Sequence, residues 1–203
     1  MLKYPPAVPI WILSNPRVGS SYMCSLLNST GICPRFDEYC QPRWWDDKYL
    51  VKPPIHNKIH FSMFWHFKNV DLESLLPGIK YVLLRRNDFV ATAVSHYLAR
   101  KLQQFSVSSN GWLNTGEVEY DEEVLLELYW TTKHWHTAYN DYLSTREYFE
   151  LEYEELVADP IGMTKQILEF SNHQGDVNTG NVIVKMEHPQ KEEFIRRLRS
   201  KVG

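Results

Sequence analysis

Short apolar runs alternate with helix-patterned segments along this chain, and that alternation is the feature that most restricts its fold. The runs Pro9–Asn15, Lys80–Leu84 and Tyr148–Tyr153 have strand length and end in turn residues, which predicts three buried strands. The mixed stretch Ile55–Phe64 predicts a further strand. No hairpin signal joins any two of them. The sequence therefore predicts an α/β fold with three layers, in which helices flank a central parallel sheet.

The intervening segments have helical periodicity. Apolar residues recur three or four positions apart, and Asp71, Gly31 and Pro160 stand where helices start or stop. The expected helices cover residues 22–28, 71–76, about 88–105, 121–143 and 160–170. In the segment that ends near Phe105, the side chains expected on one buried face are Val90, Val94, Tyr97, Leu98, Leu102 and Phe105. No repeat or linker divides the chain, so we expect one domain over residues 1–203.

Composition excludes several classes of partner. The 203 residues carry a formal net charge of -3, so no general basic field attracts nucleic acid, and an anionic ligand needs a local cluster of cations. No apolar run has the length of a membrane span or of a signal-peptide core. The cysteines Cys24, Cys33 and Cys40 are odd in number and lack metal-ligand spacing. We therefore expect a reduced, cytoplasmic protein without a metal site.

The segment Trp11–Cys24 places a polar loop between a strand and a helix. The first N–H groups of such a helix point outward and carry partial positive charge, which favours phosphate or sulfate. Gly19 allows close approach of the anion, Ser20 and Ser21 supply hydroxyl donors, and Arg17 supplies a permanent cation. The Walker A lysine is missing, which disfavours a kinase or ATPase loop. A plain strand-to-helix turn is the structural alternative.

A second polar group follows the Lys80–Leu84 strand. Arg85 and Arg86 end this strand, and Ser95 lies in the helix after it. If the strand neighbours the first one, these side chains lie at the carboxyl edge of the sheet, where open α/β sheets bind ligands. An arginine fork with a hydroxyl group suits a second phosphate. The alternative is that both arginines are ordinary surface charges.

Taken in order along the chain, these segments resemble the PAPS-dependent sulfotransferases, and are most similar to the bacterial trehalose 2-sulfotransferase family. PAPS is 3′-phosphoadenosine 5′-phosphosulfate, and PAP is its desulfated product. This sequence has valine at position 18, where that family usually has serine. The matching stretches are Pro16–Ser21, Ser29–Gly31, Pro34–Tyr39, Arg85–Asp88, Ala93–Ser95, Tyr153–Pro160 and Glu192–Arg199.

The resemblance implies a P-loop-like fold and specific roles for the site residues. The first loop would hold the 5′-phosphosulfate, and Arg17 would neutralise the bridging oxygen as the sulfuryl group leaves. Arg86 and Ser95 would bind the 3′-phosphate, with Arg85 as the alternative arginine. No metal is implied, since sulfuryl transfer depends mainly on the positioning of the reactants and on electrostatic stabilisation. The loop residues expected at the cofactor are Arg17, Val18, Gly19, Ser20, Ser21 and Tyr22.

The acceptor implied by the resemblance is a small molecule with a hydroxyl group, such as a sugar or glycolipid. Glu38 matches the general base of the family, and His56, His60 and His66 are rival bases. Trp44 and Trp45 follow Glu38 closely and have the flat apolar faces on which sugars stack. The sequence leaves a homodimer open and does not name the acceptor.

Two other functions compete with this hypothesis. One is a P-loop-like kinase or nucleotide hydrolase, which would need a loop lysine and Mg²⁺ ligands. The other is a non-catalytic module that binds a nucleotide or an anion.

Overall fold

A parallel four-stranded sheet lies at the centre of the molecule. The computed structural model describes residues 8–31, 56–59, 64, 68–105, 116–179 and 187–203. Within them, the strands β1 (Ile10–Ser14), β2 (His56–Ile59), β3 (Lys80–Arg85) and β4 (Tyr148–Glu152) pair in the order β2-β1-β3-β4. All three pairings are parallel. The polar segments that follow β1, β3 and β4 therefore reach the same edge of the sheet.

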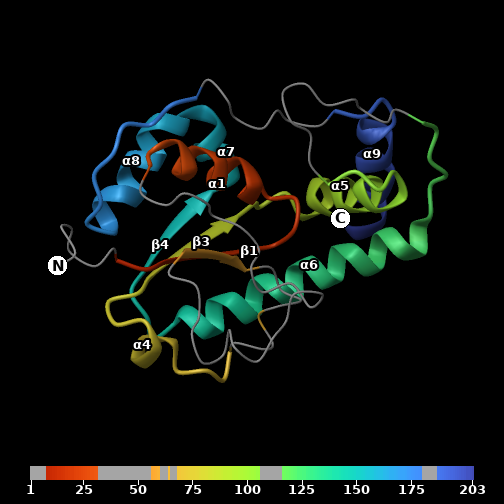
Figure 1. Ribbon diagram of the computed structural model, residues 1–203. Coiled ribbons are helices and arrows are strands. Elements are labelled where there is room, and N and C mark those ends of the chain that lie inside the picture. The colour runs from red at the N-terminus through yellow and green to blue at the C-terminus, as the bar shows by residue number, and fades with distance from the viewer. Residues whose placement is uncertain (1–7, 32–55, 60–63, 65–67, 106–115, 180–186) are drawn as a thin grey trace.

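Helices cover both faces of the sheet (Figure 1). The helices α1 (Ser20–Ser29), α7 (Tyr153–Ala158) and α8 (Pro160–Phe170) lie on one face, and α4 (Leu72–Leu75) and α6 (Glu122–Leu143) on the other. The helices α5 (Phe89–Lys101) and α9 (Lys191–Val202) lie toward the carboxyl ends of the strands, beside one end of α6. The predicted three-layer α/β architecture with a parallel sheet is thus confirmed.

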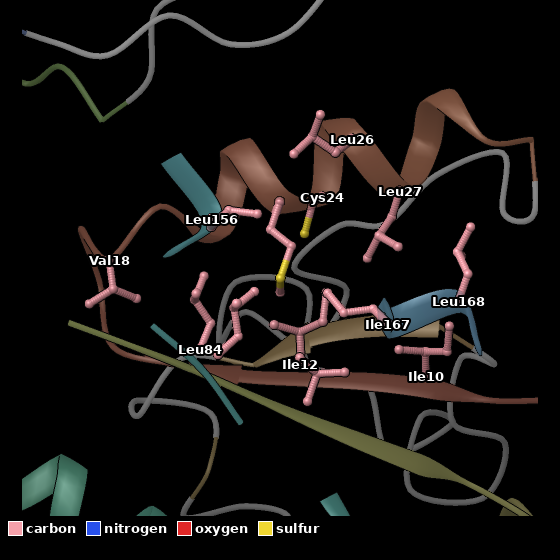
Figure 2. Close-up of a cluster of buried hydrophobic side chains, with 13 residues drawn as sticks. Ile10, Ile12, Val18, Cys24, Leu26, Leu27, Leu84, Leu156, Ile167 and Leu168 are labelled. Carbon is pink, nitrogen blue, oxygen red and sulfur yellow. The ribbon is translucent and has the colours of Figure 1, made fainter. Parts of the chain in front are cut away.

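Alternation of side chains along the strands builds two separate cores. Ile10 and Ile12 of β1 and Leu84 of β3 face α1, α7 and α8, where they pack among leucines and isoleucines of those helices (Figure 2). Trp11 and Leu13 face α4 and α6. Since the two faces take alternate residues, neighbouring residues at the end of a strand are directed to opposite sides of the sheet.

The core between the sheet and α1 consists mainly of apolar side chains. Cys24 belongs to this core as a buried thiol, and Val18 of the loop before α1 joins it (Figure 2). A thiol of this kind packs as a small apolar group.

Two expectations about burial were wrong. The helix after β3 ends at Lys101, because Gln103 adopts a positive φ of 54°, and Phe105 is 52% exposed instead of continuing the buried face. The run Tyr148–Tyr153 forms the edge strand β4, where only Leu151 is buried. An edge strand has a neighbour on one side, so its apolar residues remain partly exposed.

No helix in the described ranges is both long enough and apolar enough to span a membrane.

Candidate anion-binding site

The loop after β1 reaches α1 through a left-handed turn. Arg17 and Gly19 have positive φ angles of 69° and 85°. Gly19 is the N-cap of α1 and supplies no side chain to the helix, so the first N–H groups of α1 have no side-chain cap. Those N–H groups and the helix dipole make the start of α1 suited to an anion.

The start of this loop is fixed by contacts with the core and with α6. The valine at position 18 is fully buried against the α1 side of the sheet (Figure 2). The Asn15 amide donates to the backbone oxygen of Thr132 at 3.2 Å, and the Tyr139 hydroxyl donates to the oxygen of Ser14 at 3.1 Å. Both partners lie on α6. The side chain of Val18 therefore anchors the loop. At position 18 only the backbone can face a ligand.

Arg17 is held against α5 and the turn that follows it. Its Nε donates to the Ser95 hydroxyl at 3.3 Å, and its Nη1 donates to the backbone oxygen of Phe105. Burial lowers the pKa of the Arg17 guanidinium, and the nearby Tyr153 hydroxyl opposes that shift. An arginine keeps its proton under such shifts, so Arg17 supplies a half-buried positive charge beside the start of α1.

Lys58 is a site residue that the sequence analysis did not single out. It lies on β2 opposite Ile12 of β1, so both side chains share the face toward α1. Lys58 is only 5% exposed, and its Nζ donates to the Ser21 hydroxyl at 3.1 Å. A lysine inside a mixed apolar run is the only sequence signal that points to it. The structure thus adds a second cation, and a buried one, next to the loop.

The ring of Tyr153 links the loop to the end of β3. A Cβ atom placed on Gly19 would lie 2.6 Å from Cδ2 of Tyr153, so the ring packs directly on the glycine backbone. The Arg86 guanidinium lies over the same ring, with its Cζ 4.9 Å from the ring centroid. Such an arrangement is typical of a cation–π contact. Tyr153 therefore contacts both elements that the sequence predicts to bind anions.

Two neighbouring arginines, Arg85 at the end of β3 and Arg86 directly after it, are directed to opposite sides of the sheet. Arg86 lies on the α7 side, where its Nε is 3.3 Å from Oε1 of Glu154. Arg85 forms an ion pair with Glu150 of β4 and lies 3.7 Å from Glu152 of the same strand. Burial lowers the pKa of His136 on α6, and the positive charge of Arg85 lowers it further. Arg85 and Arg86 therefore belong to different surroundings.

The structure brings together part of the predicted site. Arg17 contacts Ser95, which was expected beside Arg86, while Arg86 contacts Tyr153 and Glu154. Ser20 is buried at the start of α1. Burial raises the pKa of the Tyr22 hydroxyl, and the nearby Tyr153 raises it further. Several candidates lie outside the described residues: Glu38, Trp44, Trp45, His60, His66 and the side chain of His56.

A metal cluster is absent from the described ranges, in which no three His, Cys, Asp or Glu side chains converge on one point.

Comparison with models of protein families identifies the family of this chain. A model described as "Sulfotransferase family" matches residues 38–174, which is more than half of the sequence. The chain belongs to the sulfotransferase family. The matched region contains Lys58, both β3 arginines and Tyr153, and it begins after the loop that carries Arg17. A search of curated proteins found no match.

Solved structures of sulfotransferases share the fold. The sulfotransferase domain from the curacin biosynthetic pathway aligns with a TM-score of 0.50 at 14% identity and covers 96% of both chains. The mouse sulfotransferase SULT7A1, crystallised with PAP, aligns with a TM-score of 0.51 at 16% identity. That alignment covers 96% of this chain and 64% of the mouse protein. The predicted P-loop-like fold is therefore confirmed for this sulfotransferase.

The contact between Gly19 and Tyr153 predicts a specific cost for a side chain at position 19. Gly31 also has a positive φ, 73°, but a Cβ there would meet nothing within 4 Å. Gly31→Ala should lower the free energy of unfolding by about 1–2 kcal/mol, the cost of a left-handed backbone. Gly19→Ala adds the overlap with the ring and should cost about 2–5 kcal/mol in total. Urea unfolding of both variants measures the difference, and equal losses would show that the ring yields freely.

Proposed function

We propose that this sulfotransferase binds PAPS and transfers its sulfuryl group to a hydroxyl of a small, carbohydrate-like acceptor. The observation that carries the proposal is the ring of Tyr153, which contacts Gly19 of the first loop and Arg86 of the second strand end. The loop suits a 5′-phosphosulfate and Arg86 suits a 3′-phosphate, so one ring joins two anion sites. The PAP complex of the structurally similar mouse enzyme supports the same cofactor.

Around the 5′ group, cations and amides would stabilise charge as the sulfuryl group leaves. In the transfer, the acceptor oxygen forms a bond to sulfur while the bond from sulfur to the bridging phosphate oxygen breaks. Negative charge grows on that oxygen, and PAP departs with it. Arg17, Lys58 and the first N–H groups of α1 are placed to stabilise that charge. Ser95 would act mainly by orienting Arg17, since its hydroxyl accepts from the Arg17 Nε.

The 3′-phosphate is assigned to Arg86 in preference to Arg85. Arg86 shares its side of the sheet with Tyr153 and with the loop, whereas Arg85 is directed toward α6 and is paired with acidic residues of β4. A nucleotide whose 5′ group lies at the start of α1 would place its 3′-phosphate near Arg86, on the same face of the sheet.

The acceptor hydroxyl must lose its proton to a base. We assign this role to Glu38. His60 is the alternative, because it lies two positions after Lys58 in the sequence. The sugar-like acceptor rests on the resemblance to trehalose 2-sulfotransferases and on Trp44 and Trp45. The cytoplasmic location and the homodimer remain predictions from the sequence.

The cofactor proposal predicts that PAP stabilises the folded protein. A ligand bound only by the native state raises the melting temperature as its concentration grows. PAP at millimolar concentration should therefore raise it, and ATP with Mg²⁺ should raise it less. The reverse order would favour a kinase.

If PAP binds, mass spectrometry of acceptor panels incubated with PAPS should show an added sulfate, and binding without any turnover would indicate a non-catalytic module.

The assignment of Arg86 predicts which arginine discriminates PAP from AMP, which lacks the 3′-phosphate. Arg86→Ala removes a charge-assisted partner and should reduce the ratio of PAP to AMP affinity by a factor equivalent to about 1.5–3 kcal/mol. Arg85→Ala is the matched control and should leave the ratio near its wild-type value. Ser95→Ala should weaken both nucleotides alike, because it acts through Arg17. Isothermal titration calorimetry gives the affinities, and loss of the ratio in Arg85→Ala alone would exchange the two roles.

The roles of Arg17 and Glu38 predict different kinetic failures. Arg17→Ala removes charge needed for binding and for the transition state, so PAP affinity and kcat should both fall. Glu38→Gln keeps the shape without the base, so PAP affinity should persist while kcat falls by about 10²–10⁴-fold. Single-turnover sulfation and PAP titration separate the two effects. Unchanged turnover in Glu38→Gln together with its loss in His60→Ala would move the base to His60.

A further inference from the structure

The strand-end arginine assigned to the 3′-phosphate already has an anionic partner. The Nε of Arg86 lies 3.3 Å from Oε1 of Glu154, the residue that follows Tyr153 on α7. That Nε is buried and has no aligned hydrogen-bond acceptor among the described residues, so its contact with Glu154 is ionic and not a directed hydrogen bond. The carboxylate thus neutralises Arg86 without fixing its orientation.

Arg86 and Glu154 differ strongly in exposure. The Arg86 side chain is 15% exposed, while that of Glu154 is 51% exposed. The aromatic ring of Tyr153 supports the guanidinium and would persist if the carboxylate moved. Glu154 therefore holds the cation loosely, from a side that water reaches, and can leave it without disturbing the stacking.

We propose that Glu154 is a specificity-determining residue that limits the affinity for the 3′-phosphate by competing for Arg86. This inference rests on the proposed function. A phosphate that approaches Arg86 must displace the carboxylate or bind within a few ångströms of its negative charge, and either event costs binding free energy. The 5′ end of the nucleotide binds elsewhere and does not experience this competition. Glu154 therefore lowers the preference for 3′-phosphorylated over unphosphorylated nucleotides, which eases release of PAP after transfer.

Titration calorimetry of wild type and Glu154→Gln with PAP and with AMP tests this. Removal of the carboxylate charge should strengthen PAP binding about threefold to fivefold, the upper part of the range for a partly exposed ion pair. AMP affinity should stay within about twofold, because AMP lacks the group that meets Arg86. Glu169→Gln makes the same charge change at an exposed position on α8 and is the matched control. It should leave both affinities unchanged.

Glu150→Gln provides a second comparison, because it removes the nearer of the two acidic partners of Arg85 and leaves Arg86 paired with Glu154. It should not alter the ratio of PAP to AMP affinity. A rise in that ratio in Glu150→Gln but not in Glu154→Gln would overturn the inference and point to Arg85.

The outcomes separate the inference from the proposed function. If wild type prefers PAP to AMP and Glu154→Gln binds PAP more weakly or equally well, the inference is wrong while the proposed function stands. Weaker binding would mean that the carboxylate positions Arg86 instead of competing for it. If wild type binds neither nucleotide, the proposed function is wrong and the inference falls with it.

Discussion

The contact between Gly19 and the ring of Tyr153 determines how the site is assembled. The loop can pass over the ring only because position 19 lacks a Cβ atom, which would lie 2.6 Å from Cδ2. The same ring supports the guanidinium of Arg86. Two segments that are far apart in sequence, the start of α1 and the end of β3, are thereby fixed relative to each other by a third segment at the end of β4. A displacement of the ring would alter both proposed anion sites together.

The parallel register explains why these three segments meet. Leu83 pairs with Leu13 in β1 and with Glu150 in β4, so the strands end almost level. Tyr153 begins α7 directly after the last residue of β4 and thus lies beside the arginines that end β3. Strand alternation then directs Arg86 toward Tyr153 and Arg85 toward α6. A shift of one residue in the register would exchange the two arginines.

Much of the fold could be predicted from the sequence because strand length, helical period and turn residues are local signals. The sequence also predicted the loop between β1 and α1 and the position of Arg86 at a strand end, since glycine, serine and arginine at the ends of strands have direct chemical meaning. It did not predict that Ser95 contacts Arg17, because that contact joins residues from two different strand–helix units. Lys58 was missed for a similar reason, because only the pairing of β1 with β2 brings its amine to Ser21. Burial of β4 was overestimated because the sequence does not show which strand lies at the edge.

The net charge of -3 is compatible with the proposed binding of a highly anionic cofactor because the relevant cations are local and at least partly buried. Exposed charges are screened by salt over about 8–10 Å, so acidic residues on distant surfaces contribute little at the loop. Lys58 is almost fully buried and Arg17 is half-buried, so their attraction for a phosphosulfate would be less screened than that of exposed charges. Arg86 differs because Glu154 lies beside it. Under the proposed function and the inference about Glu154, the site would combine strong attraction near the reacting group with a moderated cation at the far phosphate. That division would favour transfer at one end and release of the product at the other.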